Sequence, residues 1–317
     1  MAELVAFGET MLRLSPPGNE RIERADELTF RAAGAESNVA VSAGRLGVDA
    51  MWTSKLPDGP LGRKVCAELS SHGIEVTPVW SEEGRQGTYY LERGGEPRGT
   101  NVVYDRSGAA VRTATPDELP TDDIAAAEAL CVSGITPALS ETLAETTRLL
   151  FEHAREHGTE TVFDVNYRSK LWGREEARRT IERLLPAVDT LVVAARDAET
   201  VLGYEGAPAD VAADLAADWD HDTVVLTLGE DGALAAHGGD IHRQDAYPAD
   251  TQEPIGTGDA FLGGFLARRL QGDGVADALA YGAATAALKR TIPGDAATVT
   301  PAEVDAVLDS ETDSISR

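Results

Sequence analysis

Short apolar runs alternate with segments of helical periodicity along almost the whole chain. Buried strands are predicted where an apolar run is short and continuous, and helices where apolar side chains recur every three or four residues. The helix predicted at 35–46, for example, places Val39, Ala43 and Leu46 on one face. The other predicted helices span 60–72, 258–271, 275–291 and 301–308, and the predicted strands span 4–7, 49–56, 129–133, 161–165, 190–194 and 223–228.

This alternation predicts an α/β fold with a largely parallel sheet that helices cover on both faces. In such sheets ligands bind at the carboxyl ends of the strands. Two turn-rich segments, 10–33 and 85–106, interrupt the alternation, and the second contains a predicted hairpin with strands at 88–93 and 100–104. We expect both segments to be insertions that form a small sheet over the end of the main one.

The 317 residues are expected to form a single domain from residue 1 to 309, followed by a polar C-terminal tail at 310–317. No apolar run reaches the roughly 18 residues that a membrane helix needs. The N-terminus lacks the basic region of a signal peptide, so we expect a cytoplasmic protein. Cys66 and Cys131 both lie in apolar patterns and are interpreted as core residues rather than as disulfide partners or metal ligands.

The net charge of −26 indicates a strongly acidic surface. Acidic residues are spread along the whole chain, while the only lysines are Lys55, Lys64, Lys170 and Lys289. A surface this acidic repels nucleic acid and anionic membranes, so neither is an expected partner. We interpret the charge as adaptation to a halophilic cytosol, where the Debye length falls to about 3 Å at 1 M salt and self-repulsion is screened.

The strongest candidate for chemistry is the turn Gly256-Thr257-Gly258-Asp259, which an apolar helical run follows at once. A glycine-rich turn at a helix N-terminus leaves backbone N–H groups free to bind an anion and lets the backbone approach it closely. Asp259 would repel a bound phosphate, but it suits a base that takes a proton from a hydroxyl attacking that phosphate. The simpler interpretation is a helix with an acid in its first turn, as many helices have.

Other nucleotide and metal motifs fit less well. No lysine follows a glycine, so the chain lacks a Gly-Lys-Ser/Thr phosphate loop. A dinucleotide fingerprint would open the first helix, whereas this turn lies late in the chain and has Phe261 at the third glycine position. His153 and His157 stand in a highly charged segment without an evident third ligand, so a solvated helix face is the preferred interpretation there.

The glycine turn resembles the second signature, D-T-x-G-A-G-D, of the ribokinase-like (PfkB) sugar kinases. Residues 34–40 with Leu46-Gly47 are similar to their first signature, and the order and spacing fit nearly the whole chain. Residues 164–172, Asp-Val-Asn-Tyr-Arg-Ser-Lys-Leu-Trp, resemble the D-x-N-x-R-x-x-L-W run of 2-keto-3-deoxygluconate kinases. The resemblance implies a ribokinase-like three-layer sandwich with a small β-sheet lid, and an ATP-dependent sugar kinase.

The resemblance also implies roles for particular residues. Asp259 would be the catalytic base, and Gly256, Thr257 and Gly258 would form an anion hole for the transferred phosphoryl group. A sugar acid would be held by Gly34, Asn38, Tyr89, Tyr104, Arg106, Arg168, Asp259 and Asp295. ATP would be held by Asn166, Thr227, Gly229, Gly232, Gly256 and Gly258. In a protein of charge −26 a carboxylate substrate needs local positive charge, which Arg106 and Arg168 would supply.

The chain departs from the family pattern in the nucleotide and metal regions. Thr227 stands where the nucleotide turn often has lysine, and residues 253–255, Glu-Pro-Ile, replace D-T-x before the glycines. The N-x-x-E motif, which is tied to magnesium waters, would fall at residues 196–199, where only Glu199 matches. Mg²⁺ is still the expected cofactor because it neutralises the phosphates during transfer. K⁺ is a further cation that the resemblance allows, and a homo-oligomer through the lid sheet is expected because related kinases pair there.

The resemblance therefore predicts a 2-keto-3-deoxygluconate kinase that transfers a phosphoryl group from ATP to give the 6-phosphate of a small sugar acid. One alternative is a kinase of the same family for a neutral sugar such as fructose or ribose, which would leave Arg106 and Arg168 no carboxylate to pair with. Another is a sugar-acid-binding regulator without catalysis, which the intact Asp259 disfavours. The sequence leaves the choice between gluconate and galactonate epimers open.

Overall fold

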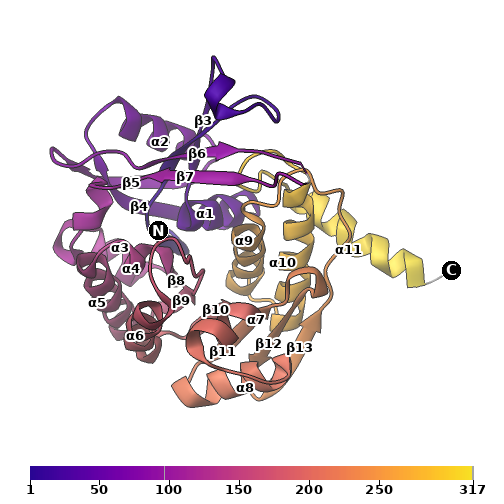
Figure 1. Ribbon diagram of the computed structural model, residues 1–317. Coiled ribbons are helices and arrows are strands. Elements are labelled where there is room, and N and C mark those ends of the chain that lie inside the picture. The colour runs from indigo at the N-terminus through magenta and orange to yellow at the C-terminus, as the bar shows by residue number, and fades with distance from the viewer. Residues whose placement is uncertain (96, 316–317) are drawn as a thin grey trace.

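The computed structural model describes residues 1–95 and 97–315, with side chains described through residue 310. Within this part of the chain nine strands form one sheet in the order β13-β12-β11-β10-β9-β8-β1-β4-β5 (Figure 1). The strands from β5 to β11 in this order are parallel, and β12 and β13 extend the sheet antiparallel. The expected largely parallel sheet is confirmed. Its strands are β1 Leu4–Phe7, β4 Ala50–Pro57, β5 Glu75–Ser81, β8 Ala129–Ser133, β9 Glu160–Asp164, β10 Thr190–Ala194, β11 Thr223–Thr227, β12 Ala233–His237 and β13 Asp240–Gln244.

Side chains alternate along each strand and divide the core into two halves. On β1, Leu4 and Ala6 pack in one apolar cluster, and Val5 and Phe7 pack in the other. Helices α1, α2, α9, α10 and α11 contribute to the first cluster, and α3, α5, α6 and α8 to the second, so the sheet is the middle of three layers. The helices are α1 Ala35–Arg45, α2 Pro60–Ser70, α3 Thr121–Ala126, α4 Ile135–Ala138, α5 Glu141–His157, α6 Arg174–Leu184, α7 Ala195–Asp197, α8 Pro208–Trp219, α9 Thr257–Leu270, α10 Val275–Arg290 and α11 Pro301–Ile315.

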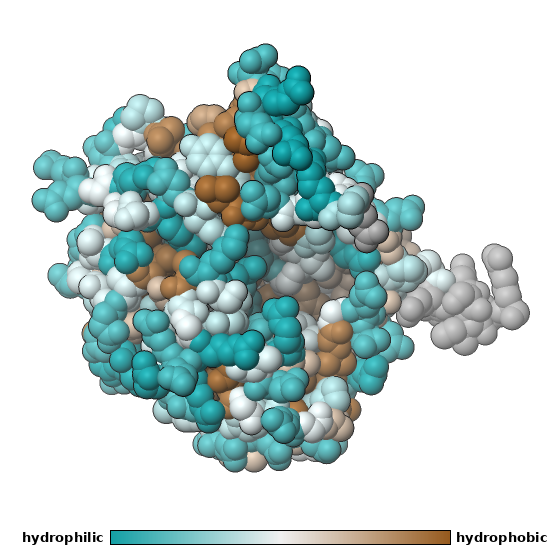
Figure 2. Space-filling view, viewed as in Figure 1, coloured by the Kyte–Doolittle hydropathy of each residue, from teal (hydrophilic) through white to brown (hydrophobic). Residues whose placement is uncertain are grey.

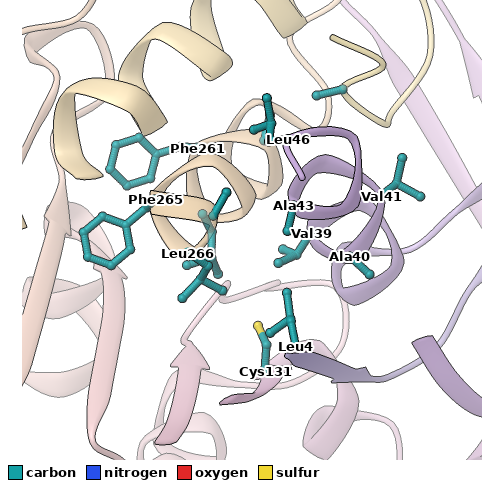
Figure 3. Close-up of a cluster of buried hydrophobic side chains, with 14 of the residues drawn as sticks. Leu4, Val39, Ala40, Val41, Ala43, Leu46, Cys131, Phe261, Phe265 and Leu266 are labelled. Atoms are coloured by element: carbon teal, nitrogen blue, oxygen red, sulfur yellow. The ribbon is translucent and has the colours of Figure 1, made fainter. Parts of the chain in front are cut away.

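Close packing of α1 against α9 fixes the position of the glycine turn. Figure 3 shows Val39 and Ala43 of α1 facing Leu266 of α9 above the end of the sheet. A Cβ atom on Gly263 of α9 would lie only 2.4 Å from the Cβ atom of Ser42, so this glycine allows the two helices to approach. The first turn of α9 is therefore held beside the first turn of α1.

The two insertions form a separate four-stranded sheet in the order β3-β2-β6-β7. β2 pairs antiparallel with β3 and parallel with β6, and β6 pairs antiparallel with β7, which confirms the predicted hairpin. Figure 1 shows this small sheet, which we call the lid, lying across one end of the molecule. Its strands are β2 Met11–Ser15, β3 Thr29–Ala33, β6 Thr88–Glu92 and β7 Asn101–Asp105.

The C-terminal segment differs from its prediction. Helix α11 does not end at residue 308 but continues to Ile315, so helical backbone covers most of the predicted polar tail at 310–317. The last two residues of that tail lie outside the described part of the chain. No helix of the described chain is both long and apolar enough to cross a membrane.

Candidate active site

Three cavities lie in a row, and neighbouring cavities share residues. The first, which we call the lid cavity, has a volume of about 200 Å³ and lies between the lid and the main sheet. The central cavity of about 370 Å³ shares Arg168, Ile255, Gly256 and Asp259 with it. A third, the helix cavity of about 200 Å³, shares Thr227, Thr257 and Gly258 with the central cavity, and its lining includes apolar residues of α9 and α10. Figure 2 shows the surface hollowed in the middle of this face, below the lid strands.

The glycine turn lies where the cavities meet, and its close approach to a neighbouring loop requires glycine at position 256. Gly256 has φ +80°, and a Cβ atom there would lie 1.8 Å from the main-chain oxygen of Asp295. It precedes the first residue of α9, whose opening N–H groups have no carbonyl partner within the helix. These amides border the central cavity and, together with the positive end of the helix dipole, suit an anion.

Asp259 is buried in the first turn of α9, with only 8% of its surface exposed. Its Oδ2 atom accepts a hydrogen bond of 2.7 Å from Nδ2 of Asn38 on α1. Burial raises the pKa of Asp259 to about 6, while the bond from Asn38 and the nearby guanidinium of Arg168 act in the opposite direction. A carboxylate with this pKa is ionised at neutral pH and can accept a proton from a hydroxyl group.

Asp164, at the end of β9, is a second acid that faces the central cavity. Burial raises its pKa to about 7, and the neighbouring charge of Asp259 contributes to the rise. Asn166, with φ +36°, holds the carboxylate by hydrogen bonds of 3.2 Å from its main-chain nitrogen and 3.1 Å from Nδ2. Asp164 is not among the predicted site residues, although its place at the end of a buried strand was a usable signal.

Three cationic side chains line the lid cavity, and they differ in how far their charge is already compensated. Arg106 is buried and forms an ion pair with Glu9. Lys170 donates a hydrogen bond of 3.0 Å to the main-chain oxygen of Val102 in the lid. The Arg168 guanidinium makes no hydrogen bond or ion pair with any described residue, and Arg168 borders both the lid cavity and the central cavity. Its guanidinium is therefore the one most available to an anionic ligand.

The structure brings the predicted site residues together at these cavities. The lid cavity is lined by every predicted sugar-acid residue, namely Gly34, Asn38, Tyr89, Tyr104, Arg106, Arg168, Asp259 and Asp295. The predicted nucleotide residues line the other two cavities: Asn166, Thr227, Gly256 and Gly258 border the central one, and Thr227, Gly229, Gly232 and Gly258 the helix one. Their shared location is observed, while their individual roles stay predictions.

Glu199 is the one predicted site residue that lies outside these three cavities. It lines a separate cavity with Arg196 and Tyr204, whereas the central cavity is lined by Asp197. The backbone changes from α-helix to π-helix between Asp197 and Glu199. The carboxylate of this segment that borders the central cavity is Asp197, and the indirect metal role of Glu199 stays a prediction.

His153 and His157, for which a solvated helix face was the preferred interpretation, are not among the residues that line these cavities. His153 on α5 contacts the main-chain oxygen of Thr121 at 3.2 Å, and His157 contacts that of His153 at 2.9 Å. In the described part of the chain, no three His, Cys, Asp or Glu residues are grouped so as to hold a metal ion by themselves.

Comparison with known proteins identifies the family to which this arrangement belongs. Residues 1–302 match the family model described as "pfkB family carbohydrate kinase". The chain is 60% identical to a 2-dehydro-3-deoxygalactonokinase of Haloferax volcanii over 97% of this chain and 96% of that protein. It is 30% identical to a 2-dehydro-3-deoxygluconokinase of Bacillus subtilis, over 92% of this chain and 91% of that one.

A solved structure supports the same assignment. The 2-dehydro-3-deoxygluconokinase of Thermotoga maritima superposes with a TM-score of 0.90 at 32% identity, covering 96% of this chain and 98% of the other. The fold and the family match agree over nearly the full length. The chain belongs to the PfkB family of carbohydrate kinases.

Proposed function

We propose that this kinase transfers the γ-phosphoryl group of ATP to the 6-hydroxyl of a 2-keto-3-deoxy sugar acid in the cytoplasm. The observation that carries the proposal is the free guanidinium of Arg168 beside Asp259, where the lid cavity meets the central cavity. In a protein of net charge −26, a cavity-lining guanidinium with no hydrogen-bond or ion-pair partner suits an anionic substrate. A neutral sugar would leave this charge without a partner.

The two ends of the site suit the two substrates. The lid cavity would take the sugar acid, with its acceptor hydroxyl directed at Asp259. The helix cavity, between Phe261, Ala283 and Ala287, offers apolar surface for the adenine ring. The triphosphate would then cross the central cavity along the glycine turn, with its γ-phosphate nearest Asp259. This order places donor and acceptor on either side of the proposed base.

In the proposed reaction, Asp259 takes the proton of the sugar hydroxyl as its oxygen bonds to the γ-phosphorus atom and the bond to the bridging oxygen of ADP breaks. The N–H groups of the glycine turn stabilise the negative charge on the transferred group. Asp164 and Asp197 line the central cavity and are carboxylates of the kind that hold Mg²⁺, directly or through water. The metal ion would supply charge neutralisation of the phosphates.

Similarity to the Haloferax volcanii enzyme favours the galactonate epimer over the gluconate epimer named in the sequence prediction. A substrate panel with coupled detection of ADP tests both choices. We expect turnover with 2-keto-3-deoxygalactonate, a lower kcat/KM with 2-keto-3-deoxygluconate, and little with fructose or ribose. Preference for a neutral sugar would replace this proposal with the neutral-sugar alternative, and the absence of turnover with every sugar would favour the regulator.

The lid is proposed to close over the bound sugar and exclude water, which would otherwise accept the phosphoryl group. Tyr89 and Tyr104 of the lid line the cavity, so a bound sugar would add contacts between the lid and the body. We expect backbone amides of β2, β3, β6 and β7 to exchange more slowly at saturating sugar acid, as measured by hydrogen–deuterium exchange. Exchange in α5, on the opposite side of the main sheet, serves as the internal control. Equal exchange with and without sugar would remove the lid from the mechanism.

The same sheet is proposed as the surface through which subunits pair. Phe30 on β3 is 45% exposed and Val103 on β7 is 50% exposed, although both are apolar. A second copy covering these side chains would remove them from water.

A further inference from the structure

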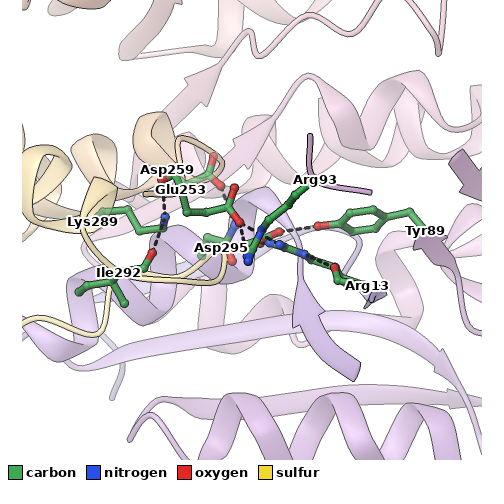
Figure 4. Close-up of polar contacts among 10 residues, drawn as sticks. Arg13, Tyr89, Arg93, Glu253, Asp259, Lys289, Ile292 and Asp295 are labelled. Carbon is green, nitrogen blue, oxygen red and sulfur yellow. Dashed lines mark hydrogen bonds and ion pairs between the residues drawn. The ribbon is translucent and has the colours of Figure 1, made fainter. Parts of the chain in front are cut away.

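Lys289, in the last turn of α10, is completely buried although it carries an ammonium group. Lysine is almost never fully buried without partners, because an ammonium loses its hydration. Its Nζ atom donates to the main-chain oxygen of Glu253 at 3.2 Å and lies 3.5 Å from that of Ile292 (Figure 4). Both partners are carbonyl oxygens, and no other hydrogen bond to this ammonium is found in the described chain.

These two carbonyls belong to the segments that shape the glycine turn. Glu253 lies three residues before Gly256, and Ile292 lies three residues before Asp295, whose main chain contacts Gly256. The same helix end also holds the first segment through its backbone, since the main-chain oxygen of Arg290 accepts bonds of 2.8 Å from Gln252 and 3.1 Å from Glu253. The Lys289 ammonium thus joins the end of α10 to both loops.

The carboxylates around the ammonium form ion pairs and hydrogen bonds with residues of the lid and its flanking loop. Glu253 pairs with Arg13 on β2 at 2.9 Å and with Arg93, and Asp295 pairs with Arg13 and accepts from the Tyr89 hydroxyl (Figure 4). Lys289 is left with the carbonyl oxygens and with the negative end of the helix dipole. Burial lowers the pKa of Lys289, and the nearby charges of Asp295 and Glu253 oppose this change.

Backbone carbonyl oxygens are also the ligands that K⁺ takes when proteins replace its hydration shell. An ammonium and a K⁺ ion carry the same charge, so either one can stabilise a group of carbonyl oxygens at such a site. We propose that the Lys289 ammonium is a built-in monovalent cation that holds the glycine turn in position, so that turnover needs no bound K⁺. This departs from the K⁺ that the family resemblance allows. It rests on phosphoryl transfer at Asp259 and not on which sugar is accepted.

The first test compares Lys289→Met, which keeps the volume of the side chain and removes its charge, with Lys64→Met as the matched control. Lys64 lies on α2 and pairs with Glu68 at the surface, so its loss is expected to leave kcat unchanged. Lys289→Met is expected to lower kcat by at least about tenfold, because small displacements of a catalytic turn are costly. It should also speed amide exchange at residues 252–258. Unchanged kcat and unchanged exchange in this variant would overturn the proposal.

The second test varies the monovalent cation, first with the wild type and then with Lys289→Ala. At one total salt concentration, wild-type kcat is expected to be the same in NaCl and in KCl, and a saturable activation by K⁺ would overturn the proposal. In Lys289→Ala, NH₄⁺ or K⁺ is expected to restore kcat saturably and tetramethylammonium is not, because only small cations fit the space left. Failure of both small ions to restore activity would assign Lys289 to packing instead. If no sugar acid is turned over, the proposed substrate fails, while exchange at residues 252–258 still decides the role of Lys289.

Discussion

Replacing Asp259 with asparagine is expected to lower kcat by about a hundredfold or more, because the variant keeps the shape of the side chain but cannot accept the hydroxyl proton. Binding of ATP and sugar acid should persist. The side-chain oxygen of the new asparagine can accept the hydrogen bond from Asn38 on α1 that Oδ2 of Asp259 accepts in the wild type. Turnover is measured by coupled ADP detection, and binding by calorimetry. Turnover near that of the wild type in a folded variant would remove Asp259 from the mechanism.

Asp277→Asn is the matched control for this variant. Asp277 lies in the first turn of α10, as Asp259 lies in that of α9, but Asp277 is exposed and lines none of the three cavities. If Asp259 were only an acid that stabilises the start of a helix, both substitutions would have the same small effect. A large loss for Asp259→Asn together with little change for Asp277→Asn would separate the catalytic from the helix-stabilising interpretation.

The pH dependence of the wild type follows from the same residue. Because the pKa of Asp259 is raised to about 6, kcat/KM is expected to fall as the pH drops below that value, since protonation removes the base. The stability of the folded protein depends on pH in the opposite direction. A carboxyl whose pKa is higher in the folded state than in the unfolded state disfavours folding when it is ionised. Asp259→Asn should therefore melt at the same or a higher temperature than the wild type at pH 8. A lower melting temperature would indicate that loss of activity reflects misfolding.

The fold was largely predictable because its regular strands are short apolar runs buried on both faces, as Ala129–Ser133 and Thr190–Ala194 are. The antiparallel strands β12 and β13 were not predicted. Ala233–His237 is rich in alanine, and Asp240–Gln244 is largely polar and exposed, so neither has the pattern of a buried strand. β12 pairs with β11 on one side and with β13 on the other, and β13 is the edge strand, so pairing with neighbouring strands explains why a weak local preference is sufficient.

The candidate site was predictable where a motif fixes the backbone and less so where partners come from distant segments. The glycine turn could be recognised because Gly256 needs φ +80°. Arg106 follows the last lid strand and Glu9 follows β1, and the two form an ion pair. The sequence around either residue contains no pattern that predicts this pair. Glu199 was selected because it matches the family motif, whereas the acid of this segment that lines the central cavity is Asp197. The burial of Lys289 could not be read from a helix whose sequence places this residue beside Arg290.

Replacing Arg168 with alanine is expected to impair the acid substrate far more than its neutral analogue, in which a hydroxymethyl group stands in place of the carboxylate. The lost charge-assisted hydrogen bond is typically worth about 1.5–3 kcal/mol, or roughly 10- to 150-fold in kcat/KM for the acid. The analogue never made that bond and should lose little. Arg168 suits this role better than Arg106, whose charge is already compensated by Glu9.

The measurement has to separate carboxylate binding from a second effect of the same guanidinium. Arg168 lowers the pKa of Asp259, so its removal raises that pKa and weakens the base for both substrates near neutral pH. Assays at pH 8 keep Asp259 ionised and isolate the contact with the carboxylate. Because Arg106 could share the carboxylate, the double variant with Arg106→Ala completes the test. Equal losses for acid and analogue in both variants would assign the arginines to folding or ATP binding, and the neutral-sugar kinase would then become the better proposal.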